Sequence, residues 1–271
     1  MSELKNVYDA VYTENESYNF HYPAKDLIVD VYARQVNGNV LDAGCGQGGN
    51  LKRLLAQGID TFGVELSTVC CEKYLADLPH INSDIVGYAE ISKQRYDGLI
   101  CFDVLEHIPE TSLDDNLKAL SSLSDSALLG IANHSDIQCG EELHLIQENA
   151  EWWVSRLKEH YVNAKCIVSL LDDAFFVVEV SNHDDGELKL DERYSYLLDF
   201  AHEYDEQWML RASYEEKLVK ERSEKQMLGN QLVEVTGDLN NFKTRYLRIL
   251  ESREIKLSNI CRKLFGRRIW E

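Results

Sequence analysis

The sequence predicts an α/β fold: a Rossmann-like, seven-stranded, mostly parallel sheet with helices on both faces, followed by a long C-terminal helix. Short apolar runs alternate with amphipathic helical segments between residues 24 and 180, which is typical of a sheet covered on both faces. A cluster of glycines follows the first apolar run. Beyond residue 193 the chain contains no proline and is rich in Glu, Lys, Leu and Arg, which favours helix.

The elements of the sheet domain follow one another in a regular order. Seven segments have the length and composition of strands: 39–43, 61–65, 80–84, 96–103, 126–133, 161–170 and 174–180. Five segments have the apolar spacing of helices: 24–35, 50–57, 68–78, 112–123 and 150–160. The last two strands have no helix between them, so we expect them to form an antiparallel pair. Ligands of such sheets bind beyond the carboxyl ends of the strands, where the strand order reverses.

The remainder of the chain divides into a linker and a tail. We expect a domain over residues 1–182, a polar, acidic linker over 183–192, and one long helix over 193–271. Apolar residues recur there with alternating spacings of four and three, at Leu228, Leu232, Val235, Leu239, Phe242, Tyr246 and Ile249. That is the seam of a coiled coil, and it predicts a homo-oligomer. The alternative is a single helix that packs back on the domain.

Charge is distributed unevenly along the chain. Residues 1–190 hold 13 basic and 32 acidic side chains, and so acidic a domain repels phosphate backbones, which argues against nucleic acid as a substrate. The end of the tail is basic and also apolar over residues 256–270. We expect this tip to contact a membrane surface or a partner protein. The alternative is a solvated helix end whose cations offset the helix dipole.

The chain has neither a run of 18 uncharged apolar residues nor an apolar core near its N-terminus, so we expect no transmembrane helix and no signal peptide. The seven cysteines have no C-x-x-C spacing, which indicates reduced thiols rather than disulfides or a zinc site. We therefore expect a cytoplasmic protein that can lie peripherally at the inner face of a membrane.

The motif with the clearest chemical meaning is residues 40–48 (VLDAGCGQG). Glycines at a turn from strand to helix let the backbone approach a ligand closely. An acid, Glu65, ends the next predicted strand, 23 residues after Asp42. A carboxylate at that place can accept both hydrogen bonds from a ribose diol. Together the two features predict a nucleoside site.

With a third segment, residues 102–108 (FDVLEHI), these motifs resemble class I S-adenosylmethionine (SAM)-dependent methyltransferases. The resemblance covers residues 20–180 and implies SAM as the cofactor. The order of a methyltransferase domain and then a coiled coil is similar to bacterial surface-polysaccharide (O-antigen) methyltransferases. This second resemblance, which is architectural, implies a sugar or glycan-like acceptor.

The resemblance also implies roles for particular residues. Asp42, Gly44 and Gly46 would line the methionine portion of SAM, and Glu65 would bind the ribose hydroxyls. Asp84 would face the adenine amino group, while Asp103 and Val104 would flank the cofactor on its other side. The remaining expected cofactor contacts are Cys45, Gln47 and Leu66, with Tyr18 and His21 as lid residues from the leader segment.

Three histidines are candidates for the general base that a hydroxyl or amine acceptor needs: His107, His134 and His144. Each could instead be a core histidine. A metal site formed by His134, His144 and Glu142 is a further alternative, although we expect no metal.

The predicted function is SAM-dependent transfer of a methyl group to a hydroxyl of a sugar or glycan, as in surface polysaccharide synthesis. Two alternatives stay open. One is N- or O-methylation of a small metabolite. The other is a non-catalytic scaffold that presents its coiled coil to a partner.

Overall fold

A computed structural model describes residues 2–15, 18, 23–183, 188–190, 195–220 and 225–251 of the chain. The chain forms two compact units, Met1–Arg193 and Tyr194–Glu271, which we describe separately. Among the described residues, no helix is both long enough and apolar enough to cross a membrane. Most of the expected linker, the lid residue His21 and the basic tip at 256–270 lie outside the described residues.

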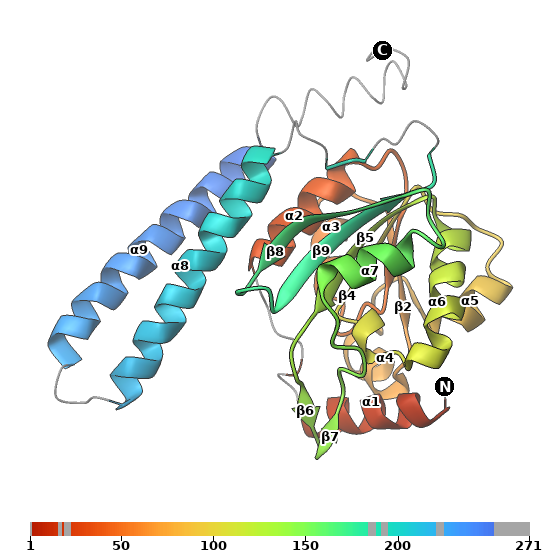
Figure 1. Cartoon of the computed structure of the whole chain (residues 1–271), viewed down its shortest axis with the longest axis horizontal. Helices are drawn as coiled ribbons and strands as arrows, with labels where there is room; N and C mark the ends of the chain where they lie inside the picture. The colour runs from red at the N-terminus through yellow and green to blue at the C-terminus, as the bar shows by residue number, and fades with distance from the viewer. Residues whose placement is uncertain are drawn as a thin grey trace, which may run out of the picture. The chain divides into compact units, whose positions relative to one another are not determined.

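The first unit is built on a seven-stranded sheet (Figure 1). The strands are β1 (Val40–Ala43), β2 (Thr61–Glu65), β3 (His80–Asn82), β4 (Gly98–Phe102), β5 (Ser126–Ala132), β8 (Asn163–Leu170) and β9 (Phe175–Ser181). Their order is β3-β2-β1-β4-β5-β9-β8, and β9 alone runs antiparallel to the six other strands. The predicted mostly parallel sheet is confirmed. The order reverses between β1 and β4, so their carboxyl ends open the crevice in which ligands of such sheets bind.

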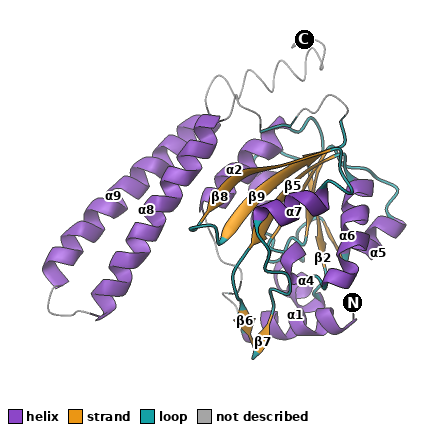
Figure 2. Ribbon diagram, viewed as in Figure 1, coloured by secondary structure: helices purple, strands orange, loops and turns teal. Residues whose placement is uncertain are grey.

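Helices cover both faces of this sheet (Figure 2). They are α2 (Pro23–Gln35), α3 (Gly49–Ala56), α4 (Thr68–Tyr74), α5 (Ile85–Ile91), α6 (Glu110–Leu123) and α7 (Ala150–Leu157). Buried side chains of α5, α6 and α7 form one core cluster with Leu99 and Cys101 of β4. Ile100, which lies between those two residues, is equally buried but is not part of the cluster, as the alternation of a strand requires. Trp153 of α7 is fully buried in this cluster.

Two elements that the sequence did not predict lie together beside the carboxyl end of the sheet. They are the helix α1 (Ser2–Glu14) and the hairpin of β6 (Ile137–Gln138) and β7 (Glu141–Glu142) (Figure 1). The side-chain amide of Asn15 donates to Gln138 at 3.3 Å, which joins the end of α1 to the hairpin. Asp9 joins α1 to the start of α4, because its carboxylate accepts the Ser67 hydroxyl at 2.6 Å and the Val69 N–H at 3.1 Å.

Over its described residues the second unit forms two helices, α8 (Ser195–Lys220) and α9 (Lys225–Leu250), whereas one long helix was predicted. The Phe242 ring of α9 contacts Phe200 of α8 with 5.2 Å between the ring centroids, and Arg245 pairs with Glu203 at 3.6 Å. These contacts join the start of α8 to the end of α9, so the chain reverses direction between them. The predicted helical tail is therefore present, but as two helices that pack on each other rather than as one.

The predicted seam is nevertheless real as an apolar face. Val235, Leu239 and Phe242 are all buried. Helices α8 and α9 pack along each other, so a helix of the same chain covers part of the face that the heptad pattern assigned to a second chain. A homo-oligomer through this face stays a prediction.

Candidate functional site

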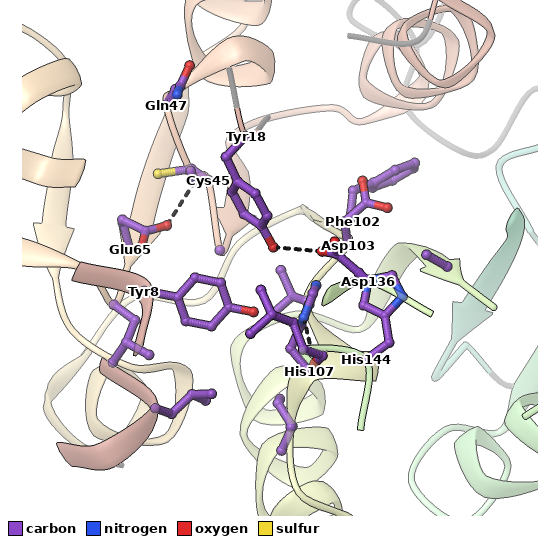
Figure 3. Close-up of a pocket in the computed structure, with 18 of the residues that line it drawn as sticks. Tyr8, Tyr18, Cys45, Gln47, Glu65, Phe102, Asp103, His107, Asp136 and His144 are labelled. Atoms are coloured by element: carbon purple, nitrogen blue, oxygen red, sulfur yellow. Dashed lines mark hydrogen bonds between the residues drawn. The ribbon is translucent and has the colours of Figure 1, made fainter. Parts of the chain in front are cut away.

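A cavity of about 1420 Å³ opens at the carboxyl ends of β1, β2 and β4 (Figure 3). It lies where the strand order reverses, as expected for this type of sheet. Side chains from α1 and from the β6–β7 hairpin form part of its wall. Helix α1 and this hairpin, which the sequence did not predict, therefore border the site.

The loop after β1 brings bare backbone to the cavity. Gly44, Gly46 and Gly48 have φ angles of 77°, 51° and 75°, a region that side chains rarely adopt. A Cβ atom at Gly44 would lie 2.3 Å from the Cγ2 atom of Val104, which is too close for any real contact. The turn and the close approach to Val104 both require glycine at position 44.

Glu65 ends β2 and is bound to this loop. Its Oε2 atom accepts the Gly46 N–H at 2.9 Å, and its Oε1 atom accepts the Ser67 N–H at 2.8 Å. Only 6% of the residue is exposed, and it lines the cavity. Burial raises the pKa of Glu65, although the hydrogen bonds from Ser67 and Gly46 act in the opposite direction. Each carboxylate oxygen has a second lone pair, so the group can still accept two hydroxyl donors.

Asp103 follows β4 with a φ of 55° and forms an ion pair that the sequence did not predict. Lys25 of α2 donates to both of its carboxylate oxygens, at 2.8 and 2.7 Å. The Lys25 ammonium also lies 3.9 Å from the centroid of the Phe175 ring. One lysine on an amphipathic helix gives no sequence signal, so only the fold identifies Lys25 as a site residue.

The two other acids that were expected to contact the cofactor, Asp84 and Asp42, differ in their position relative to the cavity. Asp84 lines the cavity and also caps α5, since its carboxylate accepts the Gly87 N–H at 2.6 Å. Asp42 is not part of the cavity wall. It is only 2% exposed, and its side chain lies in the interior of the domain, contrary to the expected contact with the cofactor. The pKa of Asp42 is raised to about 7, mainly by burial. The nearby Glu65 carboxylate also raises this pKa, whereas the Arg53 guanidinium acts in the opposite direction.

All the other expected cofactor residues that the structure describes line the cavity: Tyr18, Gly44, Cys45, Gly46, Gln47, Glu65, Leu66, Asp84, Asp103 and Val104. The Tyr18 hydroxyl donates to Asp136 at 3.4 Å. Burial raises the pKa of Tyr18, so the phenol is neutral. Tyr8 of α1 also lines the cavity, with its ring 5.7 Å from that of His107. Because α1 was not predicted, Tyr8 was missed.

The structure brings the three predicted histidines together at the cavity wall. The ring centroids of His107 and His144 are 4.6 Å apart, and those of His134 and His144 are 4.8 Å apart. His107 and His144 are each 5% exposed, whereas His134 is exposed. Burial, together with the nearby His144, lowers the pKa of His107 to about 4. His107 is therefore uncharged at neutral pH.

The acids beside these histidines have separate environments. Glu142 accepts hydrogen bonds from the Ser135 hydroxyl, from the Asp136 N–H at 2.8 Å and from the His144 N–H at 3.0 Å, and these bonds lower its pKa to about 2. Glu106 is fully buried, and burial, with Asp103 nearby, raises its pKa to about 8. The potential metal ligands that converge here are Glu106, His107 and His144, and neither Glu142 nor His134 belongs to that group.

Comparisons with known proteins agree with this geometry. A family model described as a methyltransferase domain matches residues 17–200. A search of the curated proteins gives no match.

Several solved structures share the fold. The chain is similar to 1,6-didemethyltoxoflavin-N1-methyltransferase of Burkholderia thailandensis, with 15% identity, 68% of this chain and 88% of the other covered, and a TM-score of 0.53. It is also similar to magnesium protoporphyrin IX methyltransferase (ChlM) of Synechocystis PCC 6803, with 16% identity, coverage of 67% and 99%, and a TM-score of 0.51. At these identities the likeness shows the fold.

Proposed function

The chain belongs to the methyltransferase domain family, and from that premise we propose that it transfers the methyl group of SAM to a hydroxyl of a sugar or glycan-like acceptor. SAM, when bound, supplies an electrophilic methyl group on a positively charged sulfur. The protein's own contribution is to bind the donor, to orient the acceptor in line with it and to take up the acceptor's proton.

The residues at the carboxyl end of the sheet fit SAM. Gly44 and Gly46 line the cavity with backbone alone, so the loop after β1 lets a ligand approach closely. Glu65 can accept the two ribose hydroxyls, and Asp84 lines the cavity where the adenine amino group would lie. The acids at this end also favour a cation such as a sulfonium.

The acceptor proposal depends on one observation, the composition of the wall formed by residues 132–145. Its lining side chains include Asp136, Glu141, Glu142, His134 and His144. The segment contains no Lys or Arg. A wall of carboxylates and imidazoles repels a phosphate or carboxylate but can hydrogen-bond the hydroxyls of a neutral sugar. This wall therefore favours a neutral, polyhydroxylated acceptor.

We propose His134 as the general base. It lines the cavity, and its ring is exposed, so it can reach an acceptor hydroxyl. His107 is a poor base at neutral pH because its pKa lies near 4. Asp136 lies on the same wall and accepts from Tyr18, which suits it to orient the acceptor.

A small metabolite is the second candidate acceptor. The acids of the same wall, Asp136, Glu141 and Glu142, would attract an amine, so N-methylation is compatible with the site. The scaffold alternative requires a domain that no longer binds SAM.

Labelled SAM separates these proposals. The full chain is incubated with methyl-labelled SAM and with either a neutral glycan fraction or an amine-containing metabolite fraction. We expect label in the glycan fraction, and a rate lowered by about 10²–10⁴-fold in His134→Ala, the usual contribution of a general base. Label in the amine fraction alone would replace the sugar proposal by the metabolite one. Transfer at an unchanged rate in His134→Ala would remove His134 as the base.

A further inference from the structure

Three buried side chains with metal-binding atoms converge behind the acceptor side of the cavity. They are Glu106 and His107, which lie in the short helix η1 (Leu105–His107), and His144, which follows β7. One carboxylate oxygen and one ring nitrogen of each histidine lie within 4.8 Å of one another. None of the three residues is more than 5% exposed. His107 and His144 also line the cavity, so the cluster borders the acceptor space.

The hydrogen bonds of the two histidines fix where their protons lie. The Nδ1 atom of His107 is 3.0 Å from the Leu143 carbonyl, and the Nδ1 atom of His144 is 2.6 Å from the His134 carbonyl. A carbonyl oxygen can only accept, so each Nδ1 carries a proton, and in the neutral ring the lone pair is then on Nε2. Metal-binding histidines typically have this arrangement, in which a backbone carbonyl orients the ring through the other nitrogen.

Glu106 contributes to this cluster a carboxylate oxygen that accepts no hydrogen bond from the described part of the chain. Its Oε1 atom accepts the Ala132 N–H at 2.8 Å. Its Oε2 atom is buried and has no hydrogen-bond partner among the residues that the structure describes. A buried, unsatisfied carboxylate oxygen on a residue that clusters with two imidazoles is unfavourable unless a cation or a proton satisfies it.

We propose that Glu106, His107 and His144 bind a divalent transition-metal ion. Two imidazoles and one carboxylate are a ligand set for Zn²⁺ and for related first-row ions, and three protein ligands leave coordination positions open. Because both histidines line the cavity, the open positions would face the acceptor. Building on the proposed function, an acceptor hydroxyl that coordinates the ion would lose its proton to His134 more readily.

A second group of potential ligands on the molecule serves as a contrast. Asp114, Glu159 and His160 also lie within 4.8 Å of one another, but Asp114 and Glu159 are exposed. The Arg156 guanidinium already pairs with Asp114 at 2.6 Å and with Glu159 at 3.3 Å. The Arg156 guanidinium therefore already offsets the charge of these two carboxylates, and we expect no metal ion there. His160→Ala removes a histidine from this second group and is a matched control.

The test measures metal binding and needs no acceptor. The metal-free full chain is titrated with Zn²⁺ by calorimetry, and zinc retained after dialysis is counted. We expect one ion per chain for the wild type and for His160→Ala, and at least 100-fold weaker binding for His144→Ala and Glu106→Gln. Equal zinc retention in the wild type and both site variants, or none in the wild type, would overturn the proposal.

A measurement on the wild type alone covers the case in which the site variants fail to fold. X-ray absorption at the zinc edge of the loaded chain should show two imidazole nitrogens with oxygen ligands and no sulfur. Sulfur ligands would assign the ion to the cysteines and would contradict the proposal. Because neither measurement involves methyl transfer, a negative result here leaves the proposed function standing, and the reverse also holds.

Discussion

The Glu65 carboxylate at the end of β2 accepts the backbone N–H of Gly46 at 2.9 Å, in the loop that follows β1. This bond holds the acid and the glycine loop at a fixed separation. A nucleoside bound between them would meet an acceptor for its hydroxyls on one side and bare backbone on the other. The loop and the acid therefore act as one preorganised site, in which little has to move when a ligand binds.

Gly44→Ala should destabilise the chain. The substitution places a Cβ atom at a φ of 77° and 2.3 Å from Val104, and such backbone strain costs about 1–3 kcal/mol. Gly49→Ala is the matched control, because its Cβ would meet nothing within 4 Å and would lie in the first turn of α3. In urea denaturation the free energy of unfolding should fall for Gly44→Ala and should change by less than about 1 kcal/mol for Gly49→Ala. Equal stability of the two variants would refute the account of this turn.

Asp9→Ala should loosen α1 from the rest of the first unit. It removes the acceptor for the Ser67 hydroxyl and the Val69 N–H. Lys5→Ala is the control, since it removes only a partly exposed i,i+4 ion pair and leaves those two bonds intact. Hydrogen exchange over residues 2–14 should become about tenfold faster in Asp9→Ala, as expected for the loss of roughly 1.4 kcal/mol of local stability. Unchanged exchange would show that Asp9 does not hold the helix.

Stability should depend on pH through Asp42. Its pKa is about 7 in the folded chain and near 3.9 when unfolded, so between these values the folded state holds a proton that the unfolded chain has lost. The free energy of unfolding contributed by this group therefore falls as pH rises from about 4 to 7 and is level above that.

Asp42→Asn should remove this dependence and be the more stable protein at pH 8, by up to a few kcal/mol, roughly 1.4 kcal/mol per unit of pKa shift. Urea denaturation at pH 5 and pH 8 measures the difference. Asp77→Asn, at an exposed position, is the control and should follow the wild type at both values. If the stability of Asp42→Asn also follows that of the wild type at both pH values, the pKa of the Asp42 carboxyl is not raised.

The end of the first unit can be located by truncation. Glu179 of β9 is fully buried, and its carboxylate accepts the Lys189 N–H at 2.5 Å and the Leu190 N–H at 2.9 Å. A chain ending at residue 193 keeps these bonds, whereas one ending at 182 loses both. Since hydrogen bonds to a charged group contribute about 1.5–3 kcal/mol each, the shorter chain should be clearly less stable in thermal unfolding. Equal melting temperatures would place the boundary at 182.

The sequence predicted the sheet well because its strands are short apolar runs separated by glycine and polar turns. The sequence also placed Gly44, Gly46 and Glu65 together, since they lie around two adjacent strand ends, and all three line the cavity. Lys25 and Tyr8 could not be found in this way. They reach the cavity only through tertiary packing, from helices with no local motif.

The tail shows what a periodic sequence pattern leaves undetermined. A heptad seam predicts an apolar face along a helix, but it does not say which helix covers that face. Phe242 packs against Phe200 of the same chain. The sequence pattern gave no indication of the chain reversal between α8 and α9, so the seam was assigned to a second molecule.

The central claim, that Glu65 and the glycine loop bind SAM, is tested most directly by calorimetric titration of the full chain with SAM. We expect one site per chain in the wild type and in Glu141→Gln, a matched change in an exposed acid of the cavity wall. Glu65→Gln should bind about 10–100-fold more weakly, the loss expected for one charged hydrogen bond to the ribose. No heat of binding in the wild type, or equal affinity in Glu65→Gln, would contradict the claim.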